Sequence, residues 1–206
     1  MHDETVDRTT NGKGKISDLT AAEILSLDAG GWFGEAFAGT KVPLLEDVVS
    51  HVNGRAKLLI EIKKKKHQYI GIEEQTIGII RKHNSEKWCV IQSFNDEVLE
   101  IVHDKAPDIE LHKLIVFKFR LIPYAFDGKI THFDMVKYNY IKSVNMNYLF
   151  FNNPFLKVMH DHGKKIFLWG CRKKKPCFSI ETIGCDGVIS DFPKDYIFRL
   201  NSKKPD

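Results

Sequence analysis

The sequence has no apolar run near the roughly 18 consecutive residues that a membrane-spanning helix needs, and its opening segment is mostly polar. Neither a membrane span nor a secretory signal is visible, which predicts a cytoplasmic protein. The chain also has only four cysteines, and no two of them form a CxxC pair. This argues against a zinc site and a small disulfide framework, and it predicts reduced, mostly buried thiols.

The chain also has little excess charge of one sign. It contains 31 lysines and arginines and 27 aspartates and glutamates, which gives a formal net charge of +4. So small an excess gives a mild preference for anionic partners without choosing between phosphate esters, nucleic acid and an acidic lipid surface. A hydrophobic content of 43% excludes disorder. A domain takes about 150 residues, so we expect a single domain over residues 1–206.

Short apolar runs alternate with segments of helical periodicity along most of the chain. Residues 2–18 are polar and turn-rich, and we expect a loop or hairpin tip there that adds nothing to the core. Beyond them, the alternation predicts an α/β protein with a parallel sheet, doubly wound or a barrel, because parallel crossovers take a dozen or more residues. The predicted strands are 58–62, 89–94, 110–116, 143–146, 165–169 and 187–190. The predicted helices are 21–27, 45–52, 71–83, 96–105 and 154–162.

The predicted strand over 58–62 leads into the most informative charged pair. Side chains alternate between the faces of a strand, so Glu61 and Lys63 share one face. A sheet covered on both faces tolerates charges at the carboxyl ends of its strands, where α/β folds bind ligands. An acid and a base there suit a metal and a phosphate. A surface salt bridge explains the same pattern, and the run from Lys63 to Lys66 is typical of a solvated face.

A second polar group opens the chain, with His2 followed by Asp3, Glu4, Asp7 and Arg8. Histidine both takes and gives a proton near neutral pH, as phosphodiester cleavage requires at its attacking and leaving oxygens. A frayed terminus explains the same composition without any function.

Longer stretches of the chain resemble one family. HDETVDRTTNGKGKISDLT and LDAGGWFGEAFAGTKVPLLEDVV are similar to segments of the glycerophosphodiester phosphodiesterases, with Leu44 where threonine is more usual. LLIEIK, VIQSFN and GCDGVISDFP follow in the family's order and resemble its later strand motifs. These motifs extend over nearly the whole chain, which is identified on them as a member of that family.

The resemblance implies a (β/α)8 TIM barrel that hydrolyses glycerophosphodiesters to an alcohol and glycerol 3-phosphate in lipid and glycerol metabolism, with a divalent metal, Mg²⁺ or Ca²⁺. The family uses two histidines as acid and base, and His2 matches the second of them. Glu61 matches a metal-binding glutamate, and Lys63 the cation beside the phosphate. Phe94 and Trp169 match apolar and aromatic positions around the barrel mouth, although core packing explains both equally well.

The chain departs from the family at its start. A histidine-arginine-glycine strand, a glutamate-asparagine helix start and a glutamate-x-aspartate strand precede HDET in the family, whereas this sequence begins at Met1. By resemblance, those elements supply the other histidine, a phosphate-binding arginine and two metal carboxylates. We therefore expect an incomplete barrel that lacks its N-terminal part and has about six of eight strands. The sequence leaves open whether this chain is active or inactive alone.

A second departure is FLWGCRKKKP, which keeps only Trp169 of the family's tryptophan-threonine-valine-asparagine motif. The run from Arg172 to Lys175 suits a polar head group or an anionic membrane, and a solvated loop explains it too. Two other functions therefore stay open: an inactive fragment that binds anionic phospholipid head groups, and a related phosphodiesterase acting on sphingolipids or inositol lipids. The predicted partner is a small glycerophosphodiester and not nucleic acid, and membrane contact is permitted but not required.

Overall fold

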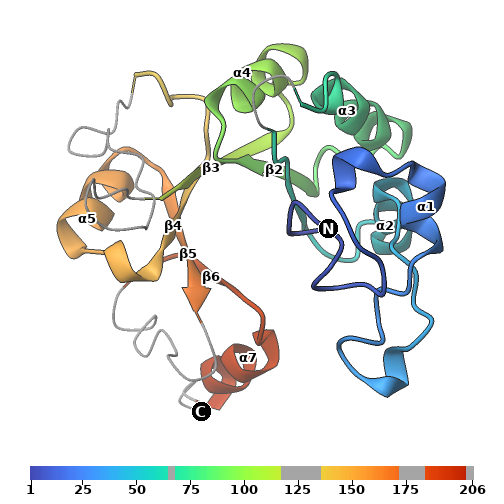
Figure 1. The fold of residues 1–206 in the computed structure, drawn as a ribbon. Coiled ribbons are helices and arrows are strands. Elements are labelled where there is room, and N and C mark those ends of the chain that lie inside the picture. The colour runs from blue at the N-terminus through green and yellow to red at the C-terminus, as the bar shows by residue number, and fades with distance from the viewer. Residues whose placement is uncertain (65–67, 117–135, 172–183, 203–206) are drawn as a thin grey trace, which may run out of the picture. The chain divides into compact units, whose positions relative to one another are not determined.

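The structure, a computed structural model, describes residues 1–64, 68–116, 136–171 and 184–202. The chain forms two compact units, the first from residues 1–58 and 64–88 and the second from residues 59–63 and 89–206. Each unit has its own set of elements (Figure 1). The single domain expected from chain length stays a prediction.

The first unit is built from short helices and loops. Thr20, and not Asp18, caps its first α-helix: the Thr20 hydroxyl accepts from the Glu23 N–H, and the Glu23 carboxylate accepts from the Thr20 N–H. The three α-helices predicted in this part of the chain are confirmed. The elements are η1 (Ile16–Asp18), α1 (Ala21–Ser26), η2 (Glu35–Phe37), α2 (Leu45–Val52) and α3 (Ile72–Lys82).

The turn-rich opening segment is a bridged loop. Thr5 and Lys15 form an isolated antiparallel bridge, and the Val6 N–H donates to the Gly14 carbonyl at 3.0 Å. Gly14 has a φ of 106°, a conformation that glycine adopts without strain. The expectation that this segment adds nothing to the core is wrong, because Val6 is fully buried.

A six-stranded sheet dominates the second unit, with β1 to β6 side by side in chain order (Figure 1). Strands β2 to β6 pair in parallel, and β1 joins β2 where the Ile62 N–H donates to the Gln92 carbonyl at 3.0 Å. A doubly wound sheet reverses its strand order at a switch point, so this sequential order is that of a barrel. Among the described residues, β1 and β6 are the outermost strands. The strands are β1 (Leu58–Glu61), β2 (Cys89–Ser93), β3 (Glu110–Ile115), β4 (Ser143–Asn147), β5 (Lys165–Cys171) and β6 (Gly187–Ser190).

Helices follow the strands along the chain. α4 (Asp96–Lys105) packs on β2 and β3, and α5 (Asn153–Asp161) packs on β5 after the short η4 (Tyr148–Phe150). Asn95 and Asn152 cap α4 and α5 by accepting backbone N–H groups of the first turn. The final helix, α7 (Pro193–Ser202), was not predicted.

The core of the second unit lies around the central strands. Every residue of β2 is buried, and β3 and β4 are buried over nearly their whole length. Burial on both faces means that the polar side chains of these strands must find partners inside the protein. Cys89 is a buried thiol, and Cys185 is a partly buried thiol whose pKa is raised by burial. No helix in the described part of the chain has the length and apolar character needed to cross a membrane.

Candidate active site

Three predicted site residues of the second unit come from the carboxyl ends of strands. Glu61 is the last residue of β1, Phe94 directly follows β2, and Trp169 lies near the end of β5. Because the strands are parallel, their carboxyl ends share one edge of the sheet, where barrel enzymes place their ligands. Lys63 follows β1 by two residues and lies at the same edge.

Glu61 and Lys63 form the pair expected from strand alternation. The Lys63 Nζ lies 3.9 Å from the Glu61 Oε1, too far for a direct hydrogen bond. The Glu61 Oε1 is buried and accepts no hydrogen bond. The Lys63 side chain is 42% exposed. The pair therefore differs from an ordinary surface salt bridge, because one carboxylate oxygen has lost water without gaining a donor.

Phe94 and Trp169 come together from strands that are not neighbours. Their rings meet edge to face, with centroids 6.1 Å apart and planes at 90°. Two strands separate β2 from β5, so a flat sheet would hold these positions roughly 14 Å apart at about 4.8 Å per strand. The contact therefore fits the curvature of a barrel wall. The Trp169 Nε1 donates to the Asn145 carbonyl at 3.3 Å, and Phe94 is 43% exposed.

His2 belongs to the first unit, where a carboxylate holds its ring. The His2 Nδ1 lies 2.8 Å from the Asp3 Oδ1, and the Arg8 Nε donates to the Asp3 Oδ2 at 2.6 Å. The hydrogen bonds from Arg8 and then from His2 hold the pKa of Asp3 well below its usual range. Asp3 is therefore ionised near neutral pH, and its carboxylate contacts one nitrogen of the His2 ring. The frayed terminus considered from composition stays an alternative, because the His2 side chain is 74% exposed.

Glu61 offers one carboxylate oxygen of the kind that divalent cations bind. The unpartnered Glu61 oxygen fits one ligand of a divalent cation, but Mg²⁺ and Ca²⁺ take several oxygen ligands. Within the described residues, no group of three or more His, Cys, Asp or Glu side chains is placed to hold a metal. Glu61 therefore accounts for one ligand and not for a complete set.

Lys64 differs from the solvated face that was expected for the first lysine run. The Lys64 Nζ pairs with the Glu73 Oε1 at 2.8 Å, and their side chains are only 11% and 1% exposed. Lys64 is thus part of a buried ion pair and not of a solvated face. The rest of the first run, at 65–66, and the whole run at 172–175 lie outside the described residues.

A buried polar layer escaped the sequence analysis. The Asn145 Nδ2 donates to the Gln92 Oε1 at 2.7 Å and lies 3.2 Å from the His112 Nδ1, while the His112 Nε2 lies 2.9 Å from the Glu110 Oε1. These residues come from β2, β3 and β4. The available signal was the presence of polar residues inside three buried strands, which implies mutual partners.

Comparisons with known proteins agree with this geometry. Residues 1–195 match the family model described as the glycerophosphoryl diester phosphodiesterase family. A glycerophosphodiester phosphodiesterase from Caldanaerobacter subterraneus subsp. tengcongensis is 34% identical over 198 residues, which cover 96% of this chain and 77% of that protein. Another from Bacillus subtilis is 30% identical over 207 residues, covering 94% of this chain and 68% of that protein.

The fold is shared with solved structures. An Oleispira antarctica phosphodiesterase, solved in complex with the product sn-glycerol-3-phosphate, aligns with a TM-score of 0.75 and 22% identity over 98% of this chain and 78% of that one. Together with the sequential parallel sheet, this likeness confirms the predicted incomplete (β/α)8 barrel. The chain belongs to the glycerophosphoryl diester phosphodiesterase family, whose members are phosphoric diester hydrolases.

Proposed function

We propose that this chain hydrolyses glycerophosphodiesters to an alcohol and glycerol 3-phosphate in lipid and glycerol metabolism. The Glu61 and Lys63 pair carries the proposal, because it sets an unpartnered carboxylate oxygen beside an ammonium at the ligand-binding edge of the sheet. The names of the relatives and the product held by the Oleispira antarctica structure support the substrate class.

Glu61 is proposed as one carboxylate ligand of a divalent cation, Mg²⁺ or Ca²⁺. A buried oxygen without a donor costs free energy, and a cation would recover it. A divalent cation bound there would supply charge stabilisation at a phosphoryl oxygen. Lys63, with its ammonium close by and partly in solvent, would bind a second phosphoryl oxygen and stabilise its growing negative charge.

His2 is proposed to move the proton. In the hydrolysis, a water oxygen bonds to phosphorus while the bond from phosphorus to the alcohol oxygen breaks. One proton leaves the water and one reaches the alcohol oxygen, and His2 serves as base or acid in one of these transfers. Because Asp3 holds its Nδ1, the transfer would use Nε2 on the opposite side of the ring.

Phe94 and Trp169 are proposed to line the apolar side of the substrate site. An edge-to-face pair that is partly exposed gives a rigid aromatic surface for the carbon skeleton of the ester. Neither ring carries charge at the phosphate, so we expect their loss to weaken substrate binding more than the chemical step.

The test is release of choline from glycerophosphocholine with Mg²⁺ or Ca²⁺ present. The assay uses a protein of residues 1–206 and a version that is extended upstream of Met1. Activity in neither version would refute the proposal. In the active version, Glu61→Gln should lower kcat/KM by about 100-fold or more and abolish stabilisation by the metal. Glu35→Gln, which changes an exposed carboxylate on η2, is the matched control and should change neither.

The two other functions considered from the sequence are outcomes of the same experiment. Binding to anionic vesicles that collapses with salt, persists in Glu61→Ala and His2→Ala, and occurs without hydrolysis would favour an inactive head-group binder. Faster cleavage of sphingolipid or inositol lipid diesters than of glycerophosphocholine would favour a related phosphodiesterase. Either result would replace the proposed substrate.

A further inference from the structure

A lysine lies fully inside the second unit. Lys113, on β3, is 1% exposed and is among the largest fully buried side chains of the described residues. An apolar side chain of similar size would fill this position without the cost of removing an ammonium from water. The partners of the ammonium therefore show what the charge contributes.

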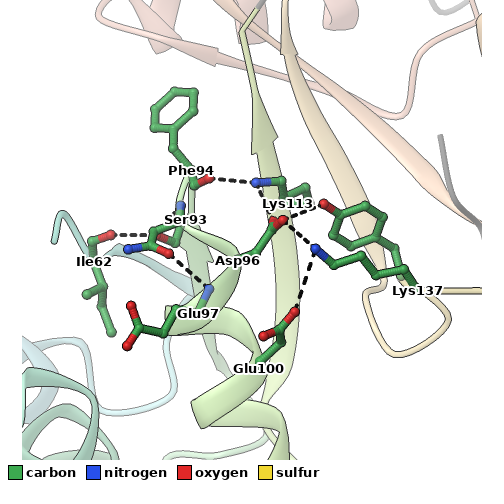
Figure 2. Close-up of polar contacts among 10 residues, drawn as sticks. Ile62, Ser93, Phe94, Asp96, Glu97, Glu100, Lys113 and Lys137 are labelled. Atoms are coloured by element: carbon green, nitrogen blue, oxygen red, sulfur yellow. Dashed lines mark hydrogen bonds and ion pairs between the residues drawn. The ribbon is translucent and has the colours of Figure 1, made fainter. Parts of the chain in front are cut away.

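The Lys113 ammonium joins a carboxylate and a backbone carbonyl. Its Nζ lies 2.8 Å from the Asp96 Oδ1 and donates to the Phe94 carbonyl at 2.6 Å (Figure 2). The second carboxylate oxygen of Asp96 accepts from the Lys137 Nζ at 2.7 Å and from the Tyr138 hydroxyl at 2.8 Å. Asp96 is thus fixed by an ion pair to Lys113 on one oxygen and by two donors on the other, and it holds Lys113 against the backbone of Phe94.

The other bonds of the β2–α4 junction leave its backbone little freedom. The Ser93 hydroxyl donates to the Ile62 carbonyl at 2.8 Å and accepts from the Asn95 N–H at 3.1 Å (Figure 2). The Asn95 side chain in turn caps α4. Of the groups in this junction, the Phe94 side chain is the one that projects outward, 43% exposed, with its ring edge to face with Trp169.

We infer that Lys113 is a positioning residue for the substrate site: its ammonium, held by Asp96, fixes the Phe94 carbonyl and so aims the Phe94 ring at Trp169. The inference rests on the proposed function in one respect, that these two rings contact the substrate. The ammonium itself faces the helix α4 side of the sheet, where Asp96 lies, and acts on the substrate only through Phe94.

The test removes the bond without leaving an unmatched buried charge. Lys113→Met combined with Asp96→Asn is neutral at both positions and lacks the donor to Phe94. We expect KM for glycerophosphocholine to rise about tenfold and kcat to change less than about twofold, because substrate contact is weakened and the reacting groups are untouched. Lys113→Gln with Asp96→Asn keeps an N–H donor and should recover most of the loss.

A spectroscopic readout separates positioning from general damage. Phe94→Leu defines the near-UV circular dichroism change caused by loss of the Phe94–Trp169 pair, and Lys113→Met/Asp96→Asn should reproduce it. Lys137→Met is the matched control, since Lys137 binds the other oxygen of the same carboxylate, and it should keep both the spectrum and KM. If the methionine version does not fold, Lys113→Leu/Asp96→Asn removes the same bond.

Failure of the positioning role and failure of the proposed function would give different results. An unchanged KM and an unchanged near-UV spectrum in the folded double variant would overturn the positioning role. Absence of hydrolysis by the unmodified protein would overturn the proposed function instead. The spectral comparison between Phe94→Leu and the double variant would still decide whether Lys113 positions Phe94.

Discussion

Replacing Asn145 with alanine would test the buried polar layer of the sheet. Asn145 is fully buried, and its Nδ2 donates to the Gln92 Oε1 and lies 3.2 Å from the His112 Nδ1. Alanine removes both interactions and leaves the Gln92 oxygen, in a side chain only 7% exposed, without this donor.

The expected cost follows from these contacts. A buried polar group that loses its partner costs about 1–3 kcal/mol, and a second lost hydrogen bond adds about 1 kcal/mol. The Asn145 Oδ1 has no hydrogen-bond partner and is itself destabilising. Its removal therefore offsets part of the loss in the free energy of unfolding. We therefore expect Asn145→Ala to lower the free energy of unfolding by about 2–3 kcal/mol. With an m-value of about 2 kcal/mol per molar urea, the midpoint falls by roughly 1–1.5 M.

The assay is urea unfolding followed by far-UV circular dichroism. Asn139→Ala is the matched control, because Asn139 is exposed and the same atoms are removed. The control should stay within about 0.5 kcal/mol of the unmodified protein. A midpoint for Asn145→Ala no lower than that of Asn139→Ala would refute the reasoning.

Three further predictions concern stability and use the same urea assay. Thr20→Ala removes the capping box of α1 and should cost about 1 kcal/mol. Lys64→Met leaves the buried Glu73 carboxylate unmatched and should cost about 3–5 kcal/mol, most of which Lys64→Met/Glu73→Leu should restore; equal losses in both would contradict a buried ion pair. Burial opposes ionisation of Asp96, but hydrogen bonds from two lysines lower its pKa to about 2. The free energy of unfolding that ionised Asp96 contributes should be fully present above pH 3.8, the ordinary pKa of an aspartate, and should be lost as pH falls through about 2. Asp96→Asn should remove this pH dependence.

Much of the fold was predictable because its strands are buried on both faces. β2 appears in the sequence as a short, mostly apolar segment followed by an amphipathic helix, and the structure places β2 and α4 there within a residue or two. The order of the strands was not predictable from periodicity, since it depends on pairing between segments. α7 was missed although Pro193 and Asp195 at its start are ordinary signals of a helix N-terminus.

The candidate site was predictable only in part. Alternation along one strand placed Glu61 and Lys63 on one face, because that relation is local. The buried Glu61 oxygen, the contact between Phe94 and Trp169 and the bond from Lys113 to a backbone carbonyl each depend on tertiary structure. Nothing in the sequence singles out Lys113 either, because its partners, Asp96 and the Phe94 carbonyl, lie in other segments of the chain.

The outermost position of β1 and β6 has a consequence for how this chain behaves in solution. Within the described residues, each of these two strands pairs with one neighbouring strand, and its other edge is where a further strand would extend the ladder. Such an addition depends on backbone geometry before it depends on side chains, so it is tolerant of sequence.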